Sequence, residues 1–280
     1  MKRLIITILT AVLPIMLCAQ AQINTKKMKL SDFTVKTTKI VLTGSTFYDV
    51  SLQDEVNATW KVSPYEFCSL DEFEQIKGND DYYFLLTVSG QFRKETEPGI
   101  DMLSLVKGGK GDDISDMLEV VTMPLRASED PSGREMTYLP ALLEMIQERA
   151  LVAMEKDFDP HMGLLSYNGN LNDADGYTFY IAREDICKDF LDNEHDMQRY
   201  VKPHMVICDA DTCDELFEEA AENAIISYTI APSNEVNGSY CYKMLIGCDN
   251  HKFYMYKKHR IGRRAGKGLL TEDMRKIAGR

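Results

Sequence analysis

The sequence WKVSPYEFCSLDEFEQIKGNDDYYFLLTV, residues Trp60–Val88, determines the architecture that we expect of this chain. Its first part alternates apolar and polar residues, as a half-buried strand does, with Pro64 limiting regular pairing. Ser69 and Glu72 have the spacing of a capping box, which predicts a helix. Tyr82–Val88 is a continuous apolar run of strand length, typical of a strand covered on both faces. We therefore expect a strand, a helix and a buried strand, whose aromatic residues pack in and around a core.

The same order of elements recurs later in the chain. His204–Cys208 resembles a short strand, Thr212 and Glu215 repeat the capping-box spacing, and Ala224–Ala231 is a second apolar strand. Residue identity between the two regions is slight, so the repeat is one of pattern. We expect two similar halves, 39–157 and 158–261, each of order β-α-β-α-β-β-β-α. This order predicts an α/β fold with mixed, mainly parallel sheets packed by helices.

The beginning of the chain has the features of a secretory signal peptide, residues 1–21. Lys2 and Arg3 form a basic start, Leu4–Leu17 is apolar, and Ala19-Gln20-Ala21 is an A-x-A cleavage site. The apolar run is short for a membrane span. We expect a periplasmic or secreted protein, cleaved near Ala21.

A lipoprotein anchored at Cys18 is the alternative for this region. It is disfavoured because Leu17 stands where lipoprotein processing needs a small residue. Residues 22–38, which follow the expected cleavage site, are interpreted as a flexible N-terminal segment.

The composition limits the possible partners. The chain has a formal net charge of −12, and removal of Lys2 and Arg3 would make it more acidic. This balance argues against general nucleic-acid binding, which needs a basic face. Six cysteines would remain after processing, and pairing is conceivable for Cys208 and Cys213, which flank a short strand-to-helix loop. Burial as small hydrophobic residues is the favoured interpretation of the six.

The last residues, 262–280, are basic in an otherwise acidic chain. Arg263, Arg264 and Lys267 lie among glycines in Gly262–Gly268, which buries little, so we expect that segment to be mobile. A short helix is expected after it, at Thr271–Ala278. Arg263, Arg264 and Lys267 are the candidate anion-binding group, which predicts weak contact with an anionic surface. The alternative is a solvated end that pairs with the acidic body of the protein.

Asp209, Asp211 and Asp214 form the candidate acidic site, for a metal ion or a general base. They follow the strand that ends at Cys208, and ligands of open α/β sheets bind beyond the carboxyl ends of strands. The favoured alternative is that they cap a helix and interact with its dipole. The sequence names no catalytic residue, metal ligand or cofactor, because it contains no H-E-x-x-H, C-x-x-C, G-x-S-x-G or G-x-G-x-x-G pattern.

Three segments of the sequence resemble those of a known family. Trp60–Phe67, Tyr82–Leu85 and Tyr240–Met244 are similar to an uncharacterised family of exported Bacteroidales proteins. The similarity covers most of the chain after the signal peptide. It implies export and assigns no activity and no functional residue.

Two functional hypotheses follow. The first is a non-enzymatic envelope protein that binds a ligand or partner, a protein or a small molecule of the cell envelope, between the two α/β halves. The alternative is a metal-assisted hydrolase with a site near Asp209 and Asp211.

Overall fold

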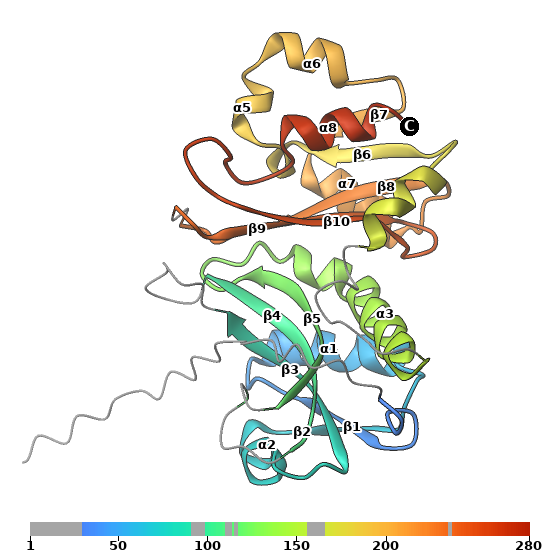
Figure 1. Ribbon diagram of the computed structural model, residues 1–280, viewed down its shortest axis with the longest axis vertical. Helices are drawn as coiled ribbons and strands as arrows, with labels where there is room; N and C mark the ends of the chain where they lie inside the picture. The colour runs from blue at the N-terminus through green and yellow to red at the C-terminus, as the bar shows by residue number, and fades with distance from the viewer. Residues whose placement is uncertain (1–29, 91–98, 110–113, 115–116, 156–165, 235–236) are drawn as a thin grey trace, which may run out of the picture.

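The computed structural model of the protein describes residues 30–90, 99–109, 114, 117–155, 166–234 and 237–280. Two five-stranded sheets with their helices are stacked along the long axis of the molecule (Figure 1). The first half contains β1 (Thr37–Val41), α1 (Thr46–Thr59), β2 (Tyr65–Cys68), α2 (Leu70–Ile76), β3 (Tyr82–Gly90), β4 (Ile100–Lys107), β5 (Leu118–Ala127) and α3 (Arg134–Glu155). The second contains η2 (Ser166–Asp173), β6 (Thr178–Ala182), η3 (Arg183–Asp185), α5 (Lys188–Leu191), α6 (Glu194–Tyr200), β7 (Met205–Cys208), α7 (Ala210–Glu218), β8 (Ala224–Ile230), β9 (Tyr240–Gly247), β10 (Phe253–Arg260) and α8 (Thr271–Ile277).

The two sheets have the same topology. Their strand orders are β2-β1-β3-β4-β5 and β7-β6-β8-β9-β10, so each strand has a counterpart in the other half. The first three strands of each half pair in parallel, and the last two are added antiparallel. The expected α/β fold, with two similar halves and mixed sheets packed by helices, is confirmed.

The region that organises the first half is arranged largely as its pattern predicts. β3 lies in the middle of its sheet, and Phe84 and Leu86 are buried. Ser69 caps α2 by accepting a hydrogen bond from the backbone N–H of Glu72 at 3.1 Å. The strand expected in the first part of this region does not include residues 60–63, because α1 continues to Thr59 and Trp60 ends that helix. The strand proper begins at Tyr65, after Pro64.

The second capping box is also wrong. α7 begins at Ala210, three residues earlier than predicted, and its N-cap is Asp209. The Asp209 carboxylate accepts hydrogen bonds from both the backbone N–H and the hydroxyl of Thr212. The local sequence offers two competent caps, and the first is used because β7 ends at Cys208, directly before it.

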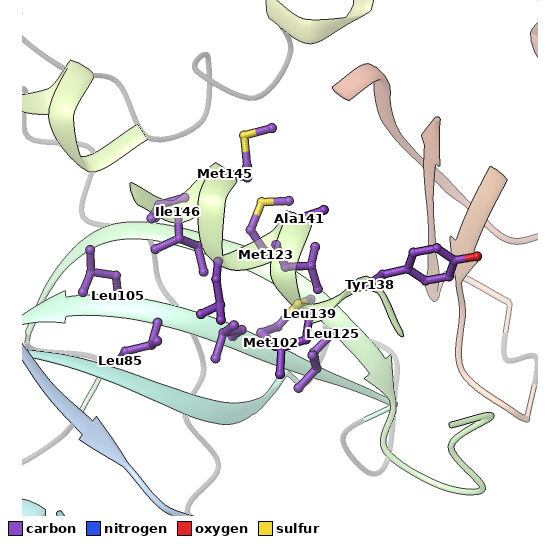
Figure 2. Packing of buried hydrophobic residues seen from close by; sticks show 14 of the residues in the cluster. Leu85, Met102, Leu105, Met123, Leu125, Tyr138, Leu139, Ala141, Met145 and Ile146 are labelled. Atoms are coloured by element: carbon purple, nitrogen blue, oxygen red, sulfur yellow. The ribbon is translucent and has the colours of Figure 1, made fainter. Parts of the chain in front are cut away.

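One hydrophobic core is continuous across both halves. Figure 2 shows side chains of α3, among them Leu139 and Ile146, pointing onto the first sheet, whereas Tyr138 points toward the strands of the second half. The same core includes Tyr228, Met244 and further residues of the second sheet. A smaller core on the other face of that sheet lies under α5, α6 and α8. The halves are therefore packed together as one folded unit.

Two expectations about the chain ends are corrected. Phe33 lies in the segment expected to be flexible, yet it is fully buried and packs edge-to-face on Tyr83 at 5.0 Å between ring centroids. In the expected basic tail, α8 contributes Met274 and Ile277 to the second core. The glycine-rich residues 262–268 fold back in a turn closed by hydrogen bonds between Gly262 and Ala265. The expected signal peptide, residues 1–21, and residues 22–29 lie outside the described residues.

Candidate functional site

A cavity of about 360 Å³ lies at the seam between the two halves. The first half lines it with the end of β5, the loop that follows and the start of α3. The second half lines it with η3, the end of β8, the loop after β8 and the segment between β10 and α8. The lining residues are Arg126, Ala127, Asp130, Ser132, Arg134, Glu184, Asp185, Tyr228, Thr229, Ile230, Ala231, Pro232, Ser233 and Lys267. Neither half forms the cavity alone.

Arg134 joins the halves at the cavity wall. It is the first residue of α3, and its guanidinium reaches three elements of the second half. Its Nη1 lies 3.3 Å from Oδ2 of Asp185, and its Nε lies 3.0 Å from Oδ1 of Asp214. Its Nη2 donates to the carbonyl of Ser227 at 3.3 Å. Burial disfavours the charge on Arg134, but the two carboxylates outweigh it and raise the pKa of the guanidinium, so the group keeps its positive charge.

Asp185 is the buried anion of the site. Its side chain is 3% exposed, and burial raises its pKa above the ordinary value for an aspartate. Against this, the carboxylate accepts hydrogen bonds from the hydroxyl of Ser227 at 2.8 Å and from the hydroxyl of Thr229 at 2.6 Å. It also accepts from the backbone N–H of Thr229. With Arg134 as the countercharge, these donors satisfy a buried carboxylate that would otherwise be costly.

Arg126 is held on the first-half side. Its cross-strand neighbour is Asp101, and its Nε donates to Oδ2 of that carboxylate at 3.0 Å. The hydroxyls of Ser89 and Ser128 also donate to the Asp101 carboxylate. These hydrogen bonds hold Asp101 in the position in which it binds Arg126. The guanidinium lies 4.9 Å from the ring centroid of Tyr48. The side chain therefore has little freedom to turn away from the cavity.

Three hydrogen bonds across the seam close the cavity region. The hydroxyl of Tyr228 donates to the carbonyl of Leu125 at 2.8 Å, in a buried position. Ser233 donates to the carbonyl of Glu129, and Asn234 donates to the Glu129 carboxylate at 2.9 Å. The first of these bonds joins β8 to β5, and the other two join the loops that follow these strands. The cavity walls are thus held together by bonds within the protein.

The charged side chains that line the cavity are balanced. Arg126, Arg134 and Lys267 are cationic, whereas Asp130, Glu184 and Asp185 are anionic. The hydroxyls of Ser132, Thr229 and Ser233 add neutral polar groups. A site with both signs of charge suits a small molecule that carries both signs.

The expected anion-binding residues are separated by the fold. Lys267 lines the seam cavity, whereas Arg263 and Arg264 lie exposed at the tip of the turn at 262–265. The structure therefore brings one of the three to the candidate site. The partly buried Arg126 and Arg134 and the buried Asp185 are not among the candidates that the sequence predicts. The sequence marks this region only by the turn-forming residues Asp-Pro-Ser-Gly at 130–133, directly before Arg134.

The expected acidic site is likewise divided. Asp209 is the N-cap of α7, which holds its pKa below the ordinary value through the hydrogen bonds from Thr212. Asp214 turns to Arg134 and accepts a hydrogen bond from the Tyr138 hydroxyl. Asp211 is exposed in the first turn of the helix. Within the described residues, no group of three or more His, Cys, Asp and Glu side chains has the arrangement of a metal site.

Comparison with known proteins assigns no relative to this architecture. Among the helices that the structure describes, none combines the length and the apolar character needed to cross a membrane. No family model matches the chain, and no curated protein and no solved structure is significantly similar to it.

Proposed function

We propose that this protein is exported and binds a small polar molecule in the seam cavity, without transforming it. The observation that carries the proposal is the cavity itself, built by charged residues from both halves of a duplicated fold. Its volume of about 360 Å³ is within the range of small-molecule sites, which runs from roughly 300 to 1,000 Å³. Export is supported by the signal-peptide pattern of residues 1–21.

The rigidity of the seam supports binding to a preformed site. One core runs through both halves, and Arg134 and Tyr228 are anchored across the seam. Opening of the halves about a hinge would expose that core. A ligand therefore enters a site whose polar groups are already in place, which reduces the ordering cost of binding.

The charge pattern indicates the class of ligand. Three cations and three anions line the cavity, and both arginines are already paired with carboxylates of the protein, so no single sign of charge dominates the lining. A zwitterion can place each of its ends near the opposite charge. Free amino acids and short peptides are the simplest molecules with this property and this size.

The proposal is tested by thermal unfolding of the mature protein, residues 22–280, in the presence of single compounds. The panel contains L-amino acids and glycylglycine, each beside its N-acetylated and its amidated analogue, which lack one charge. A zwitterion present at 100 times its Kd contributes about 2.7 kcal/mol, which corresponds to a rise of roughly 5–10 °C in Tm. We expect such a rise with at least one zwitterion and a much smaller one with its two analogues.

Two variants connect the rise in Tm to the cavity. Lys267→Ala and Glu184→Ala each remove one charge from the lining and should reduce the shift. Arg275→Ala, which removes an exposed cation of α8, is the matched control and should keep it. A panel without any stabilising zwitterion, or a shift that both cavity variants retain in full, would contradict the proposal.

A further inference from the structure

Two cysteine side chains meet where β7 leads into α7. Cys208 is the last residue of β7, and Cys213 lies in the first turns of α7. Their Sγ atoms are 3.5 Å apart. Cys208 is partly exposed and Cys213 is fully buried. All other described cysteines are buried, so this pair is the one that a reagent in solution reaches through a partly exposed thiol.

Both thiols lie against the backbone of β6. The Cys208 thiol faces the carbonyl of Ile181, and the Cys213 thiol faces the carbonyl of Tyr180 at 3.6 Å. The connection between the cysteines is fixed by Asp209, which caps α7. A disulfide requires an S–S separation of about 2.05 Å, and side-chain rotation can close a gap of this size. The strand and the helix can therefore keep their positions.

The duplicated fold supplies a comparison within the same chain. Cys68 ends β2 as Cys208 ends β7, and in each half the N-cap residue follows directly. Four residues after the N-cap the first half has Phe73, where the second half has Cys213. Cys68 therefore has no thiol at the equivalent helical position. The second half alone combines a cysteine at the strand end with a cysteine in the helix.

We propose that Cys208 and Cys213 form a disulfide bond by exchange with a small or protein disulfide. The Cys208 thiolate attacks one sulfur of the donor, the donor S–S bond breaks, and one donor sulfur leaves as a thiol. The Cys213 thiolate then attacks the Cys208 sulfur, and the second donor sulfur leaves in the same way. The two cysteines lose two electrons together, the donor disulfide gains them, and the two cysteine protons end on the donor thiols.

The environment of the pair indicates a structural bond. Burial is the main cause that raises the pKa of both thiols, so little thiolate is present at neutral pH. Exchange should therefore be slow at neutral pH and faster as the pH rises. Dithiols that act as catalysts have the opposite property, a lowered pKa at the attacking cysteine. Once formed, the bond would fix the start of α7, which carries Asp214, the partner of Arg134.

The test uses the full mature protein, first reduced and then incubated with oxidised glutathione at neutral and at mildly alkaline pH. Acid quenching, alkylation in denaturant and cleavage by an Asp-specific protease follow. The protease cuts before Asp209 and Asp211, so Cys208 and Cys213 fall on different peptides that only a disulfide can join. We expect the joined peptide in the wild type, formed faster at the higher pH.

Three variants make the result specific. Cys208→Ser and Cys213→Ser should give no joined peptide, whereas Cys68→Ser, the matched position of the first half, should give it in full. The proposal is overturned if the wild type yields both peptides alkylated at the higher pH. It is equally overturned if glutathione remains attached to Cys208, or if either cysteine is joined to a third one.

Discussion

Arg134 at the start of α3 and Asp185 at the end of η3 form an ion pair of 3.3 Å across the seam of the molecule. Their side chains are 10% and 3% exposed, and Asp214 shares the same guanidinium. The pair joins the two halves at the wall of the cavity. Both the stability of the seam and the shape of the candidate site depend on it.

Replacement of Arg134 should therefore be costly. Arg134→Met leaves two carboxylates without their cation, and removing one partner of a buried ion pair typically costs 3–5 kcal/mol. We expect a loss of about that size in the free energy of unfolding, measured by urea denaturation. Arg263→Met, at an exposed turn, should change it little. Adding Asp185→Asn to Arg134→Met should recover part of the loss, and a strictly additive double variant would contradict the pairing.

Tyr228 tests the seam with a smaller change. Tyr228→Phe removes the buried hydrogen bond to the Leu125 carbonyl and leaves that acceptor without its donor. We expect a loss of about 1 kcal/mol in the free energy of unfolding. Tyr65→Phe, which removes an exposed hydrogen bond to Asn57, is the control and should cost much less. Equal effects of the two variants would show that the Tyr228 bond adds nothing to the seam.

Asp32 should make stability depend on pH. Burial alone would raise its pKa, but hydrogen bonds from Lys107, Tyr83 and Lys36 outweigh it and hold the pKa well below the ordinary 3.8. The unfolded chain then takes up the proton first as the pH falls below about 4, so this contribution is present above that pH and is lost on further acidification.

The measurement compares urea unfolding of the wild type and Asp32→Asn between about pH 6 and pH 3. The difference in the free energy of unfolding between these two proteins should shrink as the pH falls. Asp249→Asn, at an exposed turn, should show no such trend. A constant difference between wild type and Asp32→Asn over the whole range would contradict the role of Asp32.

The sequence predicts more of the fold than of the candidate site. The apolar run Tyr82–Val88 and the Ser69 cap are local patterns, and the structure confirms both. At Asp209 and Thr212 the same local rule fits two residues, and the sequence does not show where β7 ends. In α8 most residues are charged or polar, so the composition does not indicate that the helix is packed. Its apolar residues Met274 and Ile277 pack into the second core.

The candidate site depends on contacts between residues far apart in the chain. Arg134 and Asp185 meet only because the two halves pack on each other, and no local pattern marks either residue as buried. The hypothesis of a ligand site between the halves rests on the export signal, the two similar halves and the lack of a catalytic pattern, and none of these identifies a lining residue. The side chains that line the cavity are brought together only by the packing of the halves.

Export is tested by expressing the full chain in a Gram-negative host and measuring the mass of the protein in the periplasm. We expect a mature protein that begins at Gln22, because the A-x-A pattern ends at Ala21. Arg substitutions at Ala19 and Ala21 should block cleavage, and Cys18→Ser should leave it unchanged. A lipid-modified N-terminus at Cys18, or an unprocessed chain in the cytoplasm, would contradict this expectation.

The most direct test of the central claim locates the bound ligand by methyl NMR of the mature protein, with the isoleucine side chains labelled. Ile230 lines the seam cavity, whereas Ile277 is buried in the second core under α8. Ile230→Val and Ile277→Val assign the two signals. L-amino acids and glycylglycine are added one at a time. The proposal predicts that a zwitterion which raises Tm shifts the Ile230 signal in a saturable manner and leaves the Ile277 signal in place. Saturable binding that leaves Ile230 unchanged would contradict it.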